Sequence, residues 1–236
     1  MTMPDSISKS LAIPSRRLFL GGSGAAAIML ALGGCQRMPP FTLEEAVRRL
    51  LLASTERAFT TMLQPGGFWD EQVREIGLAN MLGARGDTLS RILTSALFKE
   101  RLENAFVDVA LEATDRAAPI VTDAVRVIGI RNAYELIEGD PRAATTYLRG
   151  ELGGQLLEAM LPEVYDALRV TEDPLIAETL NALAGTDVRQ AADRVTRQVE
   201  DIIWNQIGRE EEIIRDNPRM VGDRVLEEVL SGEPTY

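Results

Sequence analysis

Three carboxylates on one predicted helix have the spacing of a metal or acid–base site. Asp108, Glu112 and Asp115 recur at positions i, i+4 and i+7, which places them on one helix face. Such a face can bind Mg²⁺ or Ca²⁺, or hold a general acid and base pair. Di-iron helical bundles add Glu-x-x-His motifs, and the chain contains no His. We interpret these three side chains as surface charge and keep a magnesium or calcium site as the alternative.

The densest acidic run is Glu210–Glu212 in the last third of the chain. Glu211 can pair with Arg215 at i,i+4 on one helix. We expect the run to form a solvated helix face.

The rest of the composition excludes several kinds of reactive site. Without His there is no imidazole base, no Ser-His-Asp triad and no His-ligated metal, and a single Cys excludes a thiolate zinc cluster. Lysine occurs only at positions 9 and 99, and no hydroxyl is spaced to use Lys99 as a base. We therefore expect no catalytic residue, no cofactor and no bound metal, and leave open whether the protein is an enzyme. The net charge of −11 also argues against nucleic acid as a partner.

The first 34 residues have the order of an export signal. Arg16 and Arg17 precede Phe19 and Leu20, and a Gly/Ala-rich apolar stretch follows, as in twin-arginine signals. Gly21 replaces the consensus Lys, so an ordinary secretory signal is the alternative.

The apolar stretch closes on the one cysteine of the chain. Leu32, Gly33 and Gly34 before Cys35 form a lipobox, which predicts cleavage after Gly34 and a diacylglyceryl thioether on Cys35. An added N-acyl chain, such as palmitate, completes an anchor stronger than a single-chain one. The alternative is an uncleaved membrane anchor, since residues 18–36 are uncharged and would reach about 28 Å as a helix.

The residue after the cysteine suggests where the anchor resides. Gln36 stands where inner-membrane lipoproteins carry Asp, so we expect the periplasmic face of the outer membrane. The predicted partners are the membrane, through the lipid on Cys35, and an envelope protein of unknown identity.

The remainder of the chain is predicted to be one all-α domain. Residues 35–41 are the lipidated Cys and a spacer, residues 42–231 the helical domain, and residues 232–236 a disordered tail. Apolar residues recur at helical spacing, and no segment shows sustained alternation of β-branched residues. Expected helices cover residues 42–62, about 87–117 with a kink or new start at Pro119, 132–139, a helix starting at Asp140-Pro141, 152–169, 174–184, 187–215 and a closing helix to 230.

Two apolar faces are expected to supply the core. They are formed by Leu102, Phe106, Val109 and Ala113, and by Val188, Ala192, Val195, Val199, Ile202 and Ile203. A further apolar stripe is expected at Ile120, Ala124, Val127 and Ile128. Phe68 and Trp69 are placed in a turn over a helix end, Gly153-Gly154 at a bend or close packing inside a helix, and Trp204 in the core.

Several short motifs in one order resemble the bacterial domain-of-unknown-function family 4197. The resemblance covers residues 44–231 and rests on Pro65–Trp69, Ala117–Ile120 with Asp123-Ala124, Ala133–Asp140, Ala143–Leu148, Leu161-Pro162 and, most specifically, Glu210–Pro218. It implies an all-helical envelope protein with no assigned activity and no catalytic residues to carry over.

The predicted function is a non-enzymatic envelope lipoprotein that serves as an interaction or structural module. Two alternatives stay open: a metal-dependent hydrolase that uses clustered carboxylates, and a carrier of an apolar ligand.

Overall fold

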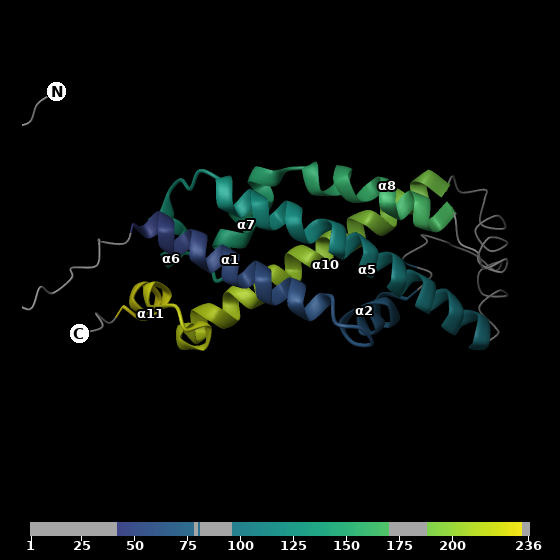
Figure 1. The fold of residues 1–236 in the computed structure, drawn as a ribbon, viewed down its shortest axis with the longest axis horizontal. Coiled ribbons are helices and arrows are strands. Elements are labelled where there is room, and N and C mark those ends of the chain that lie inside the picture. The colour runs from purple at the N-terminus through teal and green to yellow at the C-terminus, as the bar shows by residue number, and fades with distance from the viewer. Residues whose placement is uncertain (1–41, 78–79, 81–95, 170–187, 233–236) are drawn as a thin grey trace, which may run out of the picture. The chain divides into compact units, whose positions relative to one another are not determined.

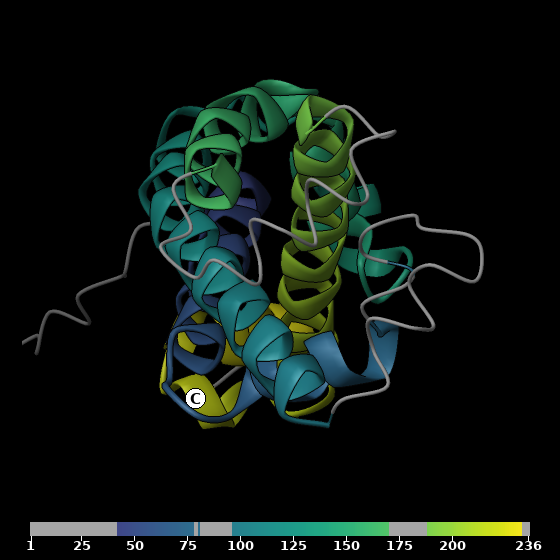
Figure 2. The same ribbon diagram turned by 90° about the vertical axis from the view of Figure 1, so that its right-hand side faces the viewer.

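Four long helices form the frame of the domain in the computed structural model, which describes residues 42–77, 80, 96–169 and 188–232. They are α1 (Leu43–Met62), α5 (Ala96–Val127), α8 (Gln155–Arg169) and α10 (Val188–Asp216). The most extensive contacts join α1 to α10, α10 to α8, α8 to α5 and α5 to α1, so the four helices close a ring. Neighbours in the ring run in opposite directions, and α10 crosses α5 at an angle (Figures 1 and 2). The expected all-α fold is confirmed.

The interior of this ring holds the predicted apolar faces. Leu102, Phe106 and Ala113 of α5 are fully or almost fully buried, and so are Val195 and Val199 of α10. Burying such side chains is the main favourable contribution to folding, at about 25 cal/mol per Å² of apolar surface.

Trp204 also lies in the core, as predicted. It is 3% exposed, and its Nε1 donates a hydrogen bond to Glu200 Oε1 at 3.2 Å. The indole therefore fills the interior while its polar atom keeps a partner.

Shorter helices cover the sides and one end of the ring. They are α2 (Phe68–Ile76) against α5, α6 (Ala133–Glu138) against α1 and α7, α7 (Ala143–Leu152) against α10, and the 3-10 helix η1 (Pro218–Val221) with α11 (Arg224–Ser231) beside α10 and α1. No helix among the described residues is both long and apolar enough to cross a membrane.

The helix α1 begins where the sequence predicts. Thr42 Oγ1 accepts a hydrogen bond from the Glu45 amide at 3.2 Å, which is one half of a capping box. The Glu45 carboxylate accepts instead from Arg49 Nε at 2.8 Å.

Phe68 and Trp69 start a helix, which corrects the expected turn. Their rings meet edge to face, with centroids 5.3 Å apart and an interplanar angle of 89°. Trp69 is 1% exposed. The aromatic pair buries the first turn of α2. The preceding glycines had indicated a turn and not the start of a helix.

The helix α5 continues through Pro119 to Val127, without a new start at the proline. Its buried residues past that point are Val121 and Val125, four apart, and Val127 is 84% exposed. The expected stripe was therefore wrong at Val127, because the buried face keeps the phase of Ala113 and Ala117 rather than shifting at the proline.

The double glycine separates two helices rather than lying inside one. Leu152 ends α7, and Gly153 has φ +54°, a left-handed conformation that favours glycine. The predicted helix at 152–169 therefore begins at Gln155. Nothing lies within 4 Å of a Cβ built on either glycine, so the bend explains them and close packing does not.

The helix α10 is unbroken at Gly208, and its 29 residues span about 43 Å. It ends before Asn217-Pro218, as predicted. Three other predictions lie outside the described residues: the helix start near Asp87, the helix at 174–184 and most of the C-terminal tail.

Candidate functional site

The acidic run Glu210–Glu212 lies mostly inside the domain rather than on a solvated face. Glu211 is fully buried and Glu210 is 6% exposed. The expectation of a solvated face was therefore wrong for these two residues. The reason is that α1 and α7 pack against this part of α10 and bring a partner to each carboxylate.

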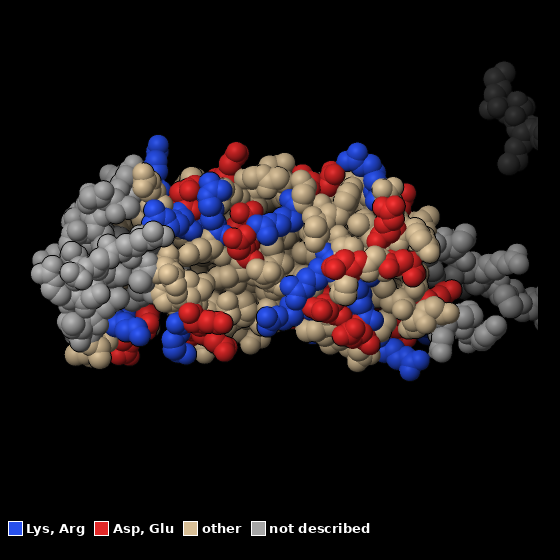
Figure 3. Space-filling view, turned by 180° about the vertical axis from the view of Figure 1, so that it is seen from behind, with Lys and Arg blue, Asp and Glu red and all other residues tan. Residues whose placement is uncertain are grey.

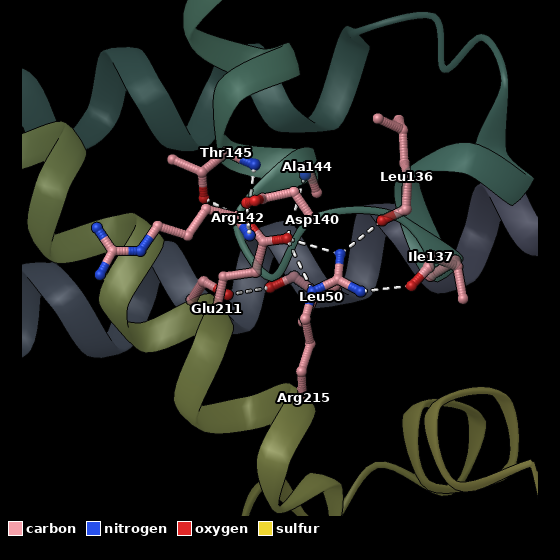
Figure 4. A network of polar contacts seen from close by, with 10 residues as sticks. Leu50, Leu136, Ile137, Asp140, Arg142, Ala144, Thr145, Glu211 and Arg215 are labelled. Carbon is pink, nitrogen blue, oxygen red and sulfur yellow. Dashed lines mark hydrogen bonds and ion pairs between the residues drawn. The ribbon is translucent and has the colours of Figure 1, made fainter.

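Glu211 caps the start of α7 from another helix. Its carboxylate accepts hydrogen bonds from the amides of Ala144 at 3.1 Å and Thr145 at 2.7 Å, and from Thr145 Oγ1 at 2.6 Å (Figure 4). The first amides of a helix have no partner within the helix, and Arg142 at the N-cap supplies no side-chain hydrogen bond. A negative charge here also complements the dipole of α7.

Arg215 joins the same carboxylate to the end of α6. Its Nε and Nη2 donate to Glu211 Oε1 at 3.0 and 2.7 Å, which confirms the predicted i,i+4 pair. Its Nη1 and Nη2 also donate to the carbonyls of Ile137 at 2.6 Å and Leu136 at 2.5 Å. The guanidinium thus satisfies carbonyls in the last turn of α6 (Figure 4).

The two residues therefore clamp the corner between α6 and α7 onto α10. The corner itself is a turn: Asp140 Oδ1 accepts from the Arg142 amide at 2.9 Å, and the Asp140 carbonyl accepts from the Ala143 amide at 2.9 Å. The predicted helix start, with Asp140 as the cap and Pro141 as the first helical residue, is thus wrong by two residues, because this turn precedes α7.

The other two glutamates of the run tie α10 to two more helices. Glu210 accepts from Arg57 Nε of α1 at 2.8 Å and from Gln206 Nε2 at 3.1 Å. Glu212 accepts from Arg142 Nε and Nη2 at 3.2 and 2.9 Å. Consecutive residues of a helix point in different directions, so one acidic run reaches several partners.

A glycine on α10 makes room for this contact. A Cβ built on Gly208 would lie 3.0 Å from Arg142 Cδ. The stem of Arg142 therefore lies directly over the glycine, which explains a glycine in the middle of a long helix despite its low helix propensity.

This arrangement is suited to holding helices together rather than to proton transfer. The carboxylate of Glu211 already accepts five hydrogen bonds, three at Oε1 and two at Oε2. A carboxylate has about four lone-pair positions, so no acceptor capacity is left for a substrate proton or a metal ion.

At the beginning of α1, two arginines make a second set of connections between helices. Arg48 Nη1 donates to the Val125 carbonyl at 2.6 Å and Nη2 to the Ile128 carbonyl at 3.1 Å, which ties α1 to the end of α5. Arg49 bonds Glu45 and Asp223, and these hydrogen bonds raise its pKa above the ordinary value.

Ion pairs at the surface are numerous and mixed in sign. Arg149 pairs with Asp201, and Arg131 with Glu151 at 2.9 Å, with all four side chains substantially exposed. Basic and acidic side chains are accordingly interspersed on the face seen in Figure 3. Exposed pairs of this kind contribute little to stability, typically about 0–1 kcal/mol each.

A cleft of about 830 Å³ lies between α8 and the beginning of α10. One part of its lining is apolar and aromatic, and the rest is polar or charged. The lining residues are Leu161, Pro162, Tyr165, Asp166, Arg189, Gln190, Asp193 and Arg194. Its size is that of a small-molecule site, and the mixed lining fits a ligand that has both an apolar and a polar part.

The carboxylates first considered for metal binding are exposed. Asp108, Glu112 and Asp115 all lie on the solvent side of α5. Within the described ranges, no group of three or more Cys, Asp or Glu residues is arranged to hold a metal ion. These three carboxylates therefore lie at the surface, as the sequence interpretation expects.

The residues predicted for export and lipid attachment lie outside the described part of the chain. These are Arg16, Arg17, Phe19, Leu20, Gly34 and Cys35.

The cap on α7 was missed by sequence reasoning. The i,i+4 spacing of Glu211 and Arg215 predicted that they pair. The backbone groups that they bind, however, lie 66 to 79 residues earlier in the chain. The only local signal was the absence of a capping side chain at Arg142, since Ser, Thr, Asp or Asn is usual at that position.

Comparison with known proteins finds a family and no individual relative. The model of the family described as "Protein of unknown function (DUF4197)" matches residues 38–231. No curated protein matches the chain. No solved structure matches it either.

Proposed function

Because the chain belongs to DUF4197, a family of proteins of unknown function, we propose a function from its own residues: a lipid-anchored helical module of the cell envelope. In this proposal the domain is held at the periplasmic face of the outer membrane and acts as an interaction or structural module. The observation that carries it is Cys35, the one cysteine of the chain, at the end of Leu32-Gly33-Gly34.

The residues before this cysteine support an exported lipoprotein. Arg16 and Arg17 stand ahead of an uncharged, Gly/Ala-rich stretch, which is the order of a twin-arginine signal. A thioether-linked diacylglycerol supplies two acyl chains, and two chains hold a protein stably where a single one does not.

The use of charged side chains supports a role in assembly rather than catalysis. Glu210, Glu211 and Glu212 each bind an arginine, and Glu211 also binds the amides at the start of α7. The polar groups that are costliest to bury therefore hold helices in place, which suits a rigid module that presents its surface to a partner.

Mass spectrometry of the membrane form tests the anchor. The expected mature chain begins at Cys35 and carries a diacylglycerol mass on it. A Cys35→Ser variant is the matched control, because it keeps the helical domain and removes the acceptor thiol; it should carry no diacylglycerol mass. An intact chain that begins at Met1, or an unmodified Cys35, would refute the lipoprotein proposal.

The cleft between α8 and α10 favours a second candidate, the carrier of an apolar ligand. Leu161, Pro162 and Tyr165 offer the apolar contacts, and charged residues of α10 offer a place for a polar head. Native mass spectrometry of protein purified from membranes tests this candidate. A bound small molecule should be lost in Leu161→Arg and kept in Tyr134→Ala, a change on α6, outside the cleft lining. Equal retention in both variants would refute a ligand in this cleft.

A further inference from the structure

Exposed apolar side chains are unevenly distributed along the described helices. Six large hydrophobic residues among them are exposed: Leu43, Leu97, Val127, Tyr134, Ile213 and Met220. Leu43 lies in the first turn of α1, and Val127 and Ile213 lie in the last turns of α5 and α10. Tyr134 belongs to α6 and Met220 to η1. Only Leu97 belongs to the beginning of α5. Large apolar groups exposed together mark a surface that contacts something else.

These elements meet at one end of the ring of helices. Arg48 in α1 bonds the carbonyls of Val125, Arg126 and Ile128, so the start of α1 lies beside the end of α5. The helix α6 contacts α1, and η1 contacts α10 and α11. Figure 1 shows all of them at the end opposite to the start of α5.

The most exposed side chains at this end suit the headgroup region of a bilayer. Val127 is 84% exposed and Tyr134 is 66% exposed. Tyrosine is enriched at membrane interfaces because its ring is apolar and its hydroxyl polar. Arg126 and Arg131 stand beside them with side chains 62% and 75% exposed, and arginine extends its charge toward water from an apolar surface.

The length of chain ahead of α1 indicates which surface this end meets. Thr42 caps α1 and is seven residues after Cys35. Fully extended, seven residues span at most ~25 Å. A lipid on Cys35 therefore keeps the start of α1 within about that distance of the membrane. Leu97, in the first turn of α5, lies 30 residues of helix, or ~45 Å, from Val127 at its end.

We propose that this end of the domain, marked by Leu43, Val127 and Tyr134, rests on the bilayer that holds the anchor. The contact orients the helices so that α8 and the start of α5 are directed away from the membrane. The surface suits zwitterionic phospholipids, because its arginines are balanced by acidic neighbours such as Asp123 and the acidic chain is repelled by anionic lipid. This inference rests on the proposed lipid anchor.

Nitroxide labels on the mature, lipidated protein test the contact. The variants Val127→Cys and Tyr134→Cys are labelled at the new thiol and reconstituted into phosphatidylcholine vesicles. Leu97→Cys is the matched control, since Leu97 is 73% exposed and lies on the same helix as Val127 at its other end. Cys35 takes no label when its sulfur is in a thioether. Collision rates with oxygen, which concentrates in lipid, and with a water-soluble nickel chelate report the surroundings of each label.

The expected result is a higher ratio of oxygen to nickel collisions at positions 127 and 134 than at 97. That difference should disappear when the same labelled chains carry Cys35→Ser and are measured without vesicles. Equal nickel collisions at all three positions on vesicles would overturn the inference and leave the anchor intact. Low collision rates with both reagents at 127 and 134 would also overturn it, because they indicate a protein partner or a second copy. Labelling of the otherwise unchanged protein at Cys35 would instead show that the lipid anchor itself is absent.

Discussion

Glu211 of α10 accepts a 2.7 Å hydrogen bond from the backbone amide of Thr145, 66 residues earlier in the chain. The carboxylate thereby serves as the cap that α7 lacks in its own sequence. Arg215, one turn further along α10, does the corresponding work for the carbonyls of α6. A single i,i+4 pair thus fixes the position of two short helices that have little stability of their own.

Removing the buried carboxylate should destabilise the domain strongly. Glu211→Ala leaves the amides of Ala144 and Thr145 without a partner and leaves Arg215, only 11% exposed, without its counter-charge. The free energy of unfolding should fall by about 3–5 kcal/mol, as for other buried pairs that lose one member. Urea titration followed by circular dichroism at 222 nm measures the loss.

The adjacent residue provides the matched control for this experiment. Glu212 pairs with Arg142, and both side chains are about 40% exposed. Glu212→Ala should therefore cost less than ~1 kcal/mol. Similar small losses for both variants would contradict the assignment of Glu211 as the cap of α7.

The long helices could be predicted from sequence because each has a local cause. The Thr42 side chain caps the start of α1, Asn217-Pro218 ends α10, and residues four apart such as Leu102 and Phe106 define a buried face. Helical periodicity and capping act within one or two turns, so they are visible in a single stretch of sequence.

The polar network could not be predicted, because its partners are distant in sequence. An acidic run such as Glu210–Glu212 is usually solvated, and the pattern around it contains nothing that separates a buried carboxylate from an exposed one. Only the packing of α7 on α10 decides that Glu211 is buried. The prediction that Val127 belongs to the buried stripe of α5 was wrong for a related reason, since the contact with α1 sets which side of α5 is covered.

Two glycines, one before α7 and one inside it, should respond in opposite ways to alanine. A Cβ on Gly139 would lie 2.4 Å from the Glu135 carbonyl oxygen, a clash that only movement of the backbone relieves. Gly139→Ala should therefore lower the free energy of unfolding by about 1–3 kcal/mol. Gly150 lies inside α7 with nothing within 4 Å of an added Cβ, so Gly150→Ala should raise it by about 0.5–1 kcal/mol. Thermal and urea melts of both variants decide, and a loss in Gly150→Ala comparable to that in Gly139→Ala would refute the steric argument.

The core should supply stability without help from a metal ion. Phe106 is 2% exposed within the ring of helices, and Phe106→Ala should cost about 3–5 kcal/mol through lost burial and the cavity left behind. A chelator added to the unchanged protein should leave the melting temperature where it is, because a ligand bound to the native state would raise it by mass action. A fall in melting temperature on chelation as large as that caused by Phe106→Ala would instead support the alternative of a metal-dependent hydrolase that uses clustered carboxylates.

The export route is tested by exchanging one basic residue for another. The double change Arg16→Lys and Arg17→Lys keeps two positive charges but removes both guanidinium groups, which offer a planar set of donors that lysine lacks. If the twin-arginine receptor reads those groups, the variant should stay in the cytoplasm with its signal uncleaved, and pulse-chase fractionation of the cells should show it. Each single Lys change serves as the graded control and should slow export less than the double change. Arrival of the double variant in the periplasm at the normal rate would assign the signal to the general secretory route. On that route the helical domain crosses the membrane unfolded, and α6 and α7 are clamped onto α10 only afterwards.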